Sequence, residues 1–488
     1  MISAKKCGSV PAVARSAKII CTLGPSLNDE ESLDRLVEAG MDAARLNLSF
    51  GQIDDHLRRL TLLRKVAERR GKNVAVIADI PGPKLRLGRI EDNRCVLEDE
   101  AIVNLKSGSD SDTGTNDVLI VEEDVFQCEL IRGDKILLSE GLVELEVESI
   151  SQETITARVL SGGEVVQRTG IHVPGQNLKD GPISDDDAPF LKFAVDNHVD
   201  YIALTYVRDG SDLLQARDKL ESMGAHIPLI AKIERPEAFA RLDGILERSD
   251  AVMMRRGDLG ANIELSKVPS VQKEVIRLAN AHGVPVIIAT QMLGSMTQAP
   301  RPTRAEASDV SNAIMDGADG VLLSAETAIG EFPHHAFDMM AKIITETEEE
   351  MRASGTRPTE FSVPDGFADT AAAMACHAAQ QCNASIIACF TASGKTAGLV
   401  AKYRPKAPVV AFCNSKKTQR FLALRWGVQT KTLDPVHDAE KMVRLVDEQI
   451  LQNNQVKTGD PIVVVYGAPI GEMGHTNAVR LHTVGSPY

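Results

Sequence analysis

Residues 285–326 read PVIIATQMLGSMTQAPRPTRAEASDVSNAIMDGADGVLLSAE, and this stretch contains the pattern that decides the fold. Two short apolar runs in it, 286–289 and 321–323, have the length and composition of buried parallel strands. Between them, the T-x-x-E sequence of residues 303–306 is a helix capping box, which predicts that a helix begins there. Gly317 is expected to end that helix, because glycine readily adopts the left-handed conformation of a helix C-terminus.

Polar residues follow both predicted strands at their carboxyl ends: Thr290 follows the first, and Ser324 and Glu326 follow the second. Strand, polar loop, helix and next strand form the repeating unit of a (β/α) barrel, in which chemistry gathers at the carboxyl ends of the strands. Asn28 is expected to cap the first helix of the chain. Six further predicted strands precede this stretch, at 19–22, 43–49, 74–78, 201–204, 228–231 and 251–254. The total of eight predicts a closed (β/α)8 TIM barrel, an α/β fold.

The composition is that of an ordinary soluble globular protein, with 43% hydrophobic and 25% charged residues. A net charge of −14 argues against a nucleic-acid partner, since phosphate binding needs clustered Lys and Arg. We find no apolar run of membrane-spanning length and no signal-peptide core near the N-terminus. The eight cysteines lack C-x-x-C pairs, as is typical of reduced thiols in a cytosol. The sequence therefore predicts a cytoplasmic protein that binds neither nucleic acid nor membrane.

The barrel pattern is interrupted once and followed by a further region. From about Gly88 to Pro174, β signals replace helical spacing, which predicts a small β-barrel-like lid domain inserted between the third and fourth barrel units. Beyond residue 350, a polar linker leads to strands at 385–390, 409–412 and 462–466, and these predict a C-terminal α/β domain. The predicted boundaries are 1–82 and 176–349 for the barrel, 83–175 for the lid and 350–488 for the C-terminal domain.

Charged and polar residues gather at the predicted strand ends. Glu234 and Asp258 follow neighbouring strands, and two such carboxylates suit a hard divalent cation that also takes substrate oxygens. Lys232 lies two residues before Glu234, so both side chains face one side of the strand. A salt bridge at the barrel rim is the alternative for any single carboxylate, but it explains the whole set poorly. The set comprises Arg45, Asn47, Ser49, Asp79, Thr205, Lys232, Glu234, Asp258, Thr290 and Glu326.

Six segments resemble the motifs of pyruvate kinases, and they occur in the same order along nearly the whole chain. They are RLNLSFG (45–51), DIPGPKLR (79–86), AKIER (231–235), MRRGDLG (254–260), ATQML (289–293) and PRPTRAE (300–306). The resemblance implies phosphoryl transfer from phosphoenolpyruvate to ADP, which gives pyruvate and ATP in the last step of glycolysis. It also implies a homotetramer and a lid that closes over the nucleotide and excludes water.

The resemblance also implies roles for residues at the strand ends. Glu234 and Asp258 would hold Mg²⁺ or Mn²⁺. Arg45 and Lys232 would contact the phosphoryl group, and Lys232 would stabilise charge in the transition state. The backbone amides near Gly257 and Asp258 would bind the substrate carboxylate, and Thr290 would help to relay the proton to the enolate. Asn47 and Arg86 would contact the nucleotide.

The third-strand motif departs from much of the family, because Ile80 replaces Thr and Lys84 replaces the Glu that helps to place K⁺. A fixed ammonium can take the place of a monovalent cation. We therefore predict that the region formed by Asn47, Ser49, Asp79 and Lys84 works without K⁺, as in the Lys-bearing bacterial branch. Alternatively, Lys84 lies at a solvated hinge.

Three further departures concern the substrate pocket. Phe50 stands where the family usually has His, and Thr169 where a Lys often contacts nucleotide phosphates, so the nucleotide preference stays open. Arg255 replaces the small residue that usually precedes Arg-Gly-Asp. Its guanidinium either pairs with a carboxylate outside the pocket or alters the affinity for phosphate.

In the C-terminal region, a predicted strand leads into the T-x-S-G-K-T sequence of residues 391–396. Cys389 replaces the first glycine of a Walker A loop, so a nucleoside triphosphatase is weakly supported. Backbone amides and hydroxyls at such a turn can still bind an anion. We predict a phosphorylated effector, a sugar phosphate or nucleoside monophosphate, at Thr391, Ser393, Gly394, Lys395 and Thr396. An ordinary helix cap without a ligand is the alternative.

Two other functions stay open at this point. A metal-dependent, pyruvate-forming aldolase would use Lys, Glu, Asp and a divalent ion in a barrel, but it would leave the lid and the third domain unexplained. An effector-binding sensor with weakened catalysis is suggested by Phe50, Thr169 and Arg255.

Overall fold

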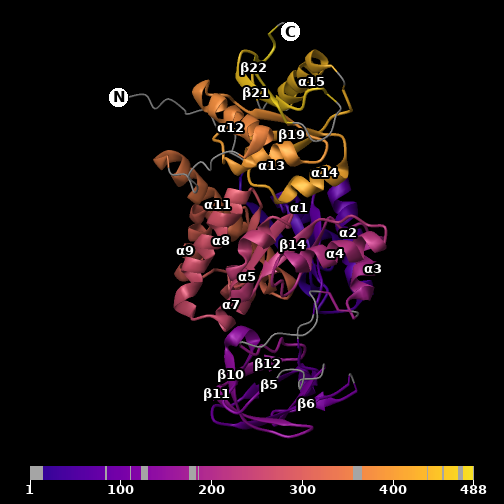
Figure 1. Ribbon diagram of the computed structural model, residues 1–488, viewed down its shortest axis with the longest axis vertical. Coiled ribbons are helices and arrows are strands. Elements are labelled where there is room, and N and C mark those ends of the chain that lie inside the picture. The colour runs from indigo at the N-terminus through magenta and orange to yellow at the C-terminus, as the bar shows by residue number, and fades with distance from the viewer. Residues whose placement is uncertain are drawn as a thin grey trace.

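The computed structural model describes residues 15–82, 85–109, 111–122, 130–174, 183–184, 186–355, 365–436, 438–452, 456–470 and 476–486. The described chain forms an elongated molecule with a central barrel, a β domain at one end and an α/β domain at the other (Figure 1). Lys84, the residue predicted to take the place of K⁺, lies outside the described residues. Among those described, no helix is long and apolar enough to cross a membrane.

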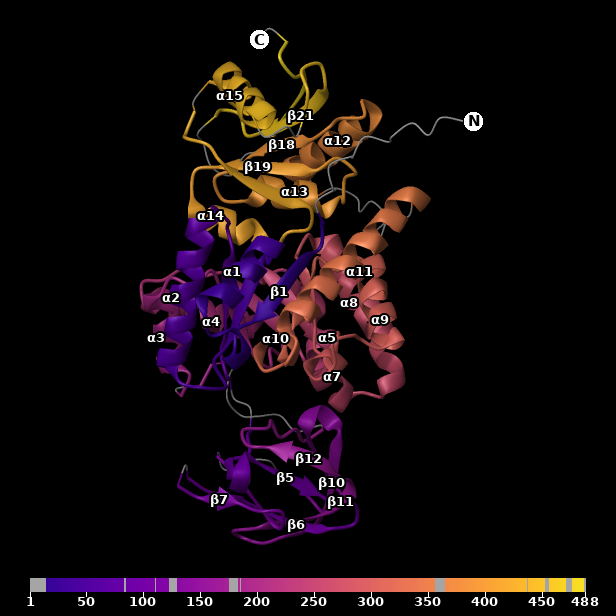
Figure 2. The same ribbon diagram turned by 180° about the vertical axis from the view of Figure 1, so that it is seen from behind.

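Eight parallel strands close into the predicted barrel, in the order β1-β17-β16-β15-β14-β13-β3-β2. In chain order the strands are β1 (Lys18–Thr22), β2 (Ala43–Asn47), β3 (Ala75–Asp79), β13 (Tyr201–Leu204), β14 (Leu229–Ile233), β15 (Ala251–Arg255), β16 (Val286–Ala289) and β17 (Gly320–Leu323). Helices surround them on the outside (Figure 2). The α-helices are α1 (Glu30–Ala39), α2 (Ile53–Arg69), α3 (Ala188–Asp196), α4 (Gly210–Ser222), α5 (Pro236–Ala240), α6 (Leu242–Leu246), α7 (Arg256–Asn262), α8 (Val268–His282), α9 (Arg304–Asp316), α10 (Ala325–Ala328) and α11 (Pro333–Ser354). The short 3-10 turns of the barrel are η1 (Pro25–Leu27), η5 (Leu265–Lys267) and η6 (Gly294–Thr297).

The helix ends follow the sequence signals with one exception. Thr303 and Glu306 form the predicted capping box of α9, and Gly317 ends that helix with φ 104°. The prediction that Asn28 caps the first helix is wrong. Asp29 is the N-cap of α1 and accepts the backbone N–H of Ser32, while Asn28 accepts from the guanidinium of Arg59. A carboxylate one residue later competes successfully for the cap position, and the negative charge also suits the helix N-terminus.

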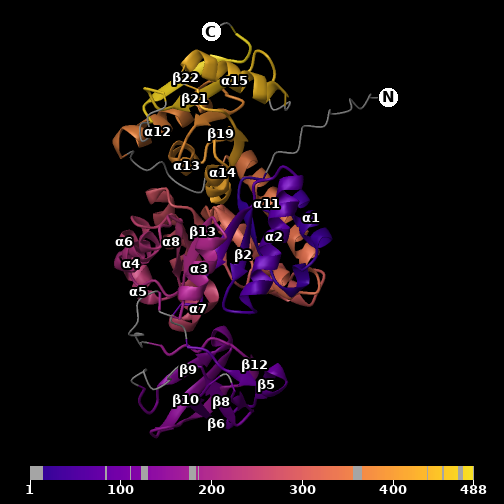
Figure 3. The same cartoon turned by 90° about the vertical axis from the view of Figure 1, so that its right-hand side faces the viewer.

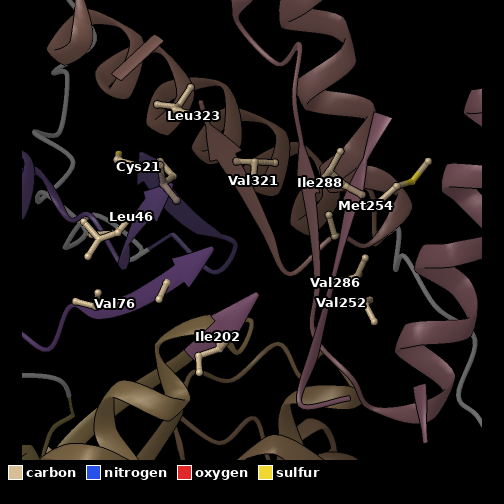
Figure 4. Packing of buried hydrophobic residues seen from close by; sticks show 14 of the residues in the cluster. Cys21, Leu46, Val76, Ile202, Val252, Met254, Val286, Ile288, Val321 and Leu323 are labelled. Carbon is tan, nitrogen blue, oxygen red and sulfur yellow. The ribbon is translucent and has the colours of Figure 1, made fainter. Parts of the chain in front are cut away.

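Residues of the barrel strands alternate between two apolar layers. Val76, Val252 and Val321 point outward and pack in the layer between the strands and the helices (Figure 4). Ile77 and Met253, one position further along, point inward and fill the interior of the barrel. This alternation follows from the side-chain period of two in a strand, and it makes the interior a packed core rather than a pore.

The β domain lies between β3 and β13 in the chain, and its core is separate from that of the barrel. A curled five-stranded sheet of order β8-β6-β11-β10-β9 is joined by the pairs β12-β5 and β4-β7 (Figure 3). The bounds are β4 (Arg89–Ile90), η2 (Glu91–Asn93), β5 (Arg94–Leu97), β6 (Ile102–Ser107), β7 (Thr113–Gly114), β8 (Val118–Val121), β9 (Lys135–Leu138), η4 (Ser139–Gly141), β10 (Val143–Ile150), β11 (Ile155–Ser161) and β12 (Gly163–Val166).

The C-terminal α/β domain has a five-stranded sheet of order β20-β19-β18-β21-β22, in which β22 runs antiparallel to β21. The predicted strands correspond to β18 (Ile387–Phe390), β19 (Val409–Cys413) and β21 (Pro461–Tyr466). The two edge strands, β20 (Val428–Thr432) and β22 (Ala478–Thr483), were not predicted. The helices are α12 (Gly366–Gln381), α13 (Lys395–Lys402), α14 (Lys416–Phe421), η7 (Leu422–Leu424) and α15 (Ala439–Gln452).

The C-terminal domain closes the amino-terminal end of the barrel, which we call the floor. Leu424 of η7 is buried in the same apolar cluster as the inward-facing residues of the barrel strands. The ring of Tyr201 stacks on Phe421 at 5.8 Å between centroids, and its hydroxyl donates to the carbonyl of Phe421 at 2.5 Å. The floor is therefore built from two domains.

Four aspartates at the floor repeat one arrangement. Asp42, Asp200, Asp250 and Asp319 directly precede alternate strands of the barrel. Each carboxylate accepts the backbone N–H at the start of the preceding barrel strand, at 2.8 to 3.0 Å. Each also pairs with an arginine; in the same order these are Arg15, Arg420, Arg217 and Arg404.

Candidate active site at the barrel mouth

A cavity of about 660 Å³ lies at the carboxyl ends of the barrel strands, which we call the mouth. The barrel and the β domain both line it, and η4 of the β domain contacts α7 there. From the barrel come Arg45, Asn47, Ser49, Phe50, Thr205, Lys232, Arg255, Asp258, Thr290 and Glu326, and from the β domain Arg86, Leu137, Ser139, Gly141, Thr169 and His172. Eight of the ten predicted strand-end residues thus line one space that the β domain covers, and the other two, Asp79 and Glu234, are buried in contact with Lys232.

Asp79 is buried at the end of β3 between two cations. Its Oδ2 accepts from Arg45 Nε at 2.7 Å, and its Oδ1 accepts from Lys232 Nζ at 3.0 Å. Burial alone would raise the pKa of Asp79, but Lys232 and Arg45 hold that pKa at about 2. Burial lowers the pKa of Lys232, against the opposing effect of the Asp79 and Glu234 carboxylates. Asp79 therefore orients both cations that face the cavity.

Glu234 is completely buried directly after β14. Its Oε2 accepts the backbone N–H of Tyr206 at 2.9 Å, in a turn where Tyr206 has φ 56°. Its Oε1 lies 3.3 Å from Lys232 Nζ. The side chains of Lys232 and Glu234 thus face the same side, as their spacing predicts.

Arg255, the last residue of β15, lies between the two predicted metal ligands. One nitrogen, Nη1, is 3.1 Å from Glu234 Oε1 and 2.9 Å from Asp258 Oδ2. These two contacts place the Arg255 guanidinium within the carboxylate cluster. Arg255 and Asp258 are three residues apart in the chain, whereas the contact with Glu234 joins two neighbouring strands.

The same contacts test whether this cluster suits a divalent ion. Two carboxylate oxygens from different elements converge on one point, where at present a cationic nitrogen lies. A hard cation held by two carboxylates, with its other positions filled by water and substrate oxygens, fits this donor set. The described residues contain no group of three or more His, Cys, Asp or Glu side chains arranged for a metal, so a fully protein-built cage is excluded for them.

Thr290 follows β16 in a left-handed conformation with φ 70°. Its hydroxyl accepts the backbone N–H of Gly257 at 2.9 Å, which joins it to the start of α7. Arg256 holds the same loop, because its Nη2 donates to the carbonyls of Thr290 at 2.9 Å and Gln291 at 3.0 Å. We did not predict this positioning by Arg256; the signal available was its place between a strand and the Gly-Asp that opens a helix.

The residues predicted for the nucleotide and for the monovalent-cation region form two groups. Ser49 connects Asn47 and Arg86: its N–H donates to Asn47 Oδ1 at 3.4 Å, and its hydroxyl accepts from Arg86 Nη2 at 2.9 Å. Asp79 instead belongs to the Arg45 and Lys232 cluster. Phe50, 47% exposed, presents an aromatic side chain to the cavity.

The predicted effector loop lies in the C-terminal domain, beyond the floor and far from the mouth (Figure 1). Thr391 Oγ1 accepts the N–H of Gly394 at 2.8 Å, and Thr396 Oγ1 hydrogen-bonds Thr476 Oγ1 at 2.7 Å. Ser393 Oγ accepts the N–H of Lys395 at 3.4 Å. These residues form a tight turn that opens α13.

Comparisons with known proteins agree over nearly the whole chain. Residues 14–337 match the family model described as pyruvate kinase, barrel domain, and residues 369–482 match pyruvate kinase, alpha/beta domain. A pyruvate kinase of Geobacillus stearothermophilus is 39% identical, over 96% of this chain and 80% of its own length. A pyruvate kinase of Corynebacterium glutamicum is 38% identical, over 96% and 98%. The crystal structure of a pyruvate kinase from Cryptosporidium parvum has a TM-score of 0.83 and 31% identity, over 96% of both chains.

Proposed function

Because the chain belongs to the pyruvate kinase family, we propose that the buried ions at the barrel mouth are its catalytic centre. The enzyme is a pyruvate kinase, which transfers a phosphoryl group to ADP in glycolysis and has phosphoenolpyruvate and ADP as substrates. One observation carries the assignment of the centre. The Glu234 and Asp258 carboxylates converge on one point, beside the ammonium of Lys232.

Glu234 and Asp258 are the residues that would hold Mg²⁺ or Mn²⁺. When bound, such an ion supplies positive charge that polarises substrate oxygens. Arg45 and Lys232 bind the phosphoryl group, and Lys232 offsets the charge that develops as phosphate leaves the enol oxygen. Asp79 fixes both cations before the substrate arrives. Preorganised charge of this kind reduces the reorganisation needed during the reaction.

Thr290 serves the protonation of the enolate that becomes pyruvate. Its hydroxyl is at the cavity, fixed by the N–H of Gly257. The amides near Gly257 and Asp258 receive the substrate carboxylate, for which the N–H of Gly257 is shared with the Thr290 hydroxyl. Lys232 is a poor proton donor while it neutralises phosphate, so Thr290 is the better relay to the methylene carbon.

The β domain acts as a lid over ADP. It already supplies Ser139, Thr169 and His172 to the cavity wall, and closure excludes water from phosphoryl transfer. Asn47 and Arg86 contact the nucleotide.

Lys84 replaces the monovalent cation, so turnover does not require K⁺. The supporting observation is the sequence, with Lys84 in place of the Glu of the K⁺ motif. Turnover in a buffer free of Na⁺ and K⁺ is the test, and full dependence on added K⁺ would contradict the proposal.

A phosphorylated effector, a sugar phosphate or AMP, binds the turn formed by Thr391, Ser393, Gly394, Lys395 and Thr396 and regulates substrate cooperativity. The enzyme is cytoplasmic and assembles as a homotetramer. Unchanged cooperativity in the presence of sugar phosphates and AMP would contradict the regulatory part, and sedimentation velocity tests the assembly.

The experiment that tests the catalytic centre is a coupled pyruvate-release assay with phosphoenolpyruvate, ADP and Mg²⁺. We expect activity that requires all three, and a loss of roughly 10³-fold in kcat for Lys232→Met, since one preorganised charge is removed. Lys192→Met is the matched control, because it makes the same change at an exposed lysine of α3 that pairs with Asp196. Release of pyruvate without ADP, or no release, would overturn the proposal.

A further inference from the structure

Arg255 makes a contact that phosphoryl transfer does not explain. Its Nη1 lies 3.1 Å from Glu234 Oε1 and 2.9 Å from Asp258 Oδ2, the two oxygens that converge on the proposed ion. An ion held by both oxygens would lie at the point between them that Arg255 Nη1 now occupies, and the repulsion between two positive charges adds to this overlap. Arg255 and the ion therefore need the same place.

The charges of the cluster explain why the Arg255 guanidinium lies between Glu234 and Asp258. Arg45, Lys232 and Arg255 are positive, and Asp79, Glu234 and Asp258 are negative, so the six charges balance. Glu234 is fully buried and Asp258 is 5% exposed, so water cannot solvate these carboxylates well. A buried carboxylate without a cationic partner is strongly destabilising. Arg255 thus stabilises the empty cluster.

The position of Arg255 also allows it to leave. Its side chain is 17% exposed and lines the cavity, so the guanidinium can turn into that space. The neighbouring Arg256 differs, because Asp309 and the carbonyls of Thr290 and Gln291 hold its guanidinium. Two adjacent arginines therefore have different tasks: Arg256 holds the loop, and Arg255 faces the ligand space.

We propose that Arg255 is a tethered cation that competes with the divalent ion for Glu234 and Asp258. Binding of the ion is then an exchange, in which the guanidinium leaves both carboxylates and turns into the cavity. The proposal rests on the metal site assigned above. Its consequence is that the enzyme binds the divalent ion more weakly than the two carboxylates alone would, while the protein stays stable without the ion.

The test measures binding of Mn²⁺ alone to the full chain, by electron paramagnetic resonance of free Mn²⁺, with no phosphoenolpyruvate or nucleotide present. Arg255→Ala removes the competitor, and we expect its Kd for Mn²⁺ to fall roughly tenfold, since a charge-assisted contact no longer has to be broken. In chelator, the melting temperature of the variant should be lower than that of the wild type. The rise in melting temperature on addition of Mn²⁺ should be larger for the variant than for the wild type. Arg255→Gln, which keeps most of the side-chain length, gives the same prediction if the alanine variant does not fold.

Arg59→Gln is the matched control. It removes a positive charge from the same cavity, but that guanidinium donates to Asn28, and the Kd for Mn²⁺ should stay within about twofold because no contact with the carboxylates is lost. Equal or weaker binding by Arg255→Ala and Arg255→Gln would overturn the inference. Asp258→Asn separates the two proposals. If Mn²⁺ binds the wild type and Asp258→Asn abolishes binding, the metal site stands whatever the Arg255 variants do. If Mn²⁺ does not bind the wild type or either Arg255 variant, the metal site itself is wrong, and the inference falls with it.

Discussion

The two ends of the barrel both hold ion pairs but arrange them differently. At the floor, four arginines each contact one aspartate, and each of these aspartates also accepts a backbone N–H of a barrel strand. At the mouth the partners are shared: Lys232 contacts Asp79 and Glu234, and Arg255 contacts Glu234 and Asp258. The floor is sealed by a second domain, whereas the mouth opens on a cavity.

This difference indicates which charged side chains can exchange a protein partner for a ligand. An arginine that contacts a single aspartate cannot move to a ligand without giving up its only carboxylate contact, so such a pair acts as structure. A shared cluster can pass a cation from one carboxylate to an incoming anion without leaving any group unpaired. Similar residues in one fold thus serve stability at one end and chemistry at the other.

The most direct way to break this comparison is to neutralise one carboxylate at each end. Glu234→Gln should reduce kcat roughly 10³-fold, because it removes a negative charge from the proposed metal site. Asp250→Asn, the matched change at the floor, can still accept the N–H of Leu229 and should keep kcat within about twofold of the wild type. Steady-state kinetics in the coupled assay measure both. A comparable loss of kcat in Asp250→Asn would end the distinction between the two ends.

A substitution that creates a cavity at the floor should reduce stability and leave kcat nearly unchanged. Leu424→Ala removes a side chain that is 1% exposed in the barrel core, and the barrel should lose about 2–5 kcal/mol of unfolding free energy. The kcat per folded molecule should stay nearly unchanged. Chemical denaturation followed by circular dichroism gives the stability, and active-site titration gives the folded fraction. Leu265→Ala, at a leucine that is 77% exposed, is the control and should cost little.

Acid titration should sharpen the comparison through two aspartates with pKa shifts of opposite sign. The cations around Asp79 hold its pKa at about 2, below the unfolded value of 3.8, so its charge contributes about 2 kcal/mol of stability above pH 4. That contribution is lost as the pH falls through 2. Burial raises the pKa of Asp200 at the floor, although Arg420 opposes the shift, so protonation of Asp200 favours the folded state.

Melting temperatures at several pH values measure this. The stability advantage of the wild type over Asp79→Asn should shrink below pH 4, as Asp79 loses its charge. The advantage over Asp200→Asn should instead grow as the pH falls through the raised pKa of Asp200. Parallel pH curves for the two variants would contradict the assignment of opposite shifts.

The last expected effect concerns the turn of residues 391–396, which lies against the floor at Gly394. Gly394 has φ 92°, and a Cβ placed there would lie 2.9 Å from the ring of Phe421, which is part of the floor. Gly394→Ala should cost about 1–3 kcal/mol from backbone strain and this contact. It should also alter the response to a sugar phosphate.

Gly366→Ala is the control for this variant. Gly366 has φ 75°, but no atom lies within 4 Å of the position that a Cβ would take, so it tests the backbone strain alone. Thermal unfolding and effector titration follow both variants. Equal effects of the two substitutions would mean that contact with Phe421 contributes nothing.

The fold could be predicted from the sequence because the same strand, loop and helix pattern is repeated along the chain. Eight apolar runs followed by polar residues fix a barrel, and barrel geometry then brings Lys232, Glu234 and Asp258 to one end. The edge strands β20 and β22 were missed because VQTKT and AVRLHT lack the apolar runs of central strands. Contacts that depend on side-chain reach were also missed. No spacing rule states that Arg255 lies between two carboxylates, or that Asp42 and Asp200 accept a neighbouring strand's N–H.

Leu424, which completes the barrel floor, also sets an order of events during synthesis. The last barrel strand ends at Leu323, so the ribosome must add roughly a hundred residues before Leu424 emerges. At about 5–20 residues per second, the nascent barrel has an uncovered apolar underside for about 5–20 seconds. Chaperone binding to ribosome-bound chains should therefore peak after β17 is made and fall once η7 has left the exit tunnel.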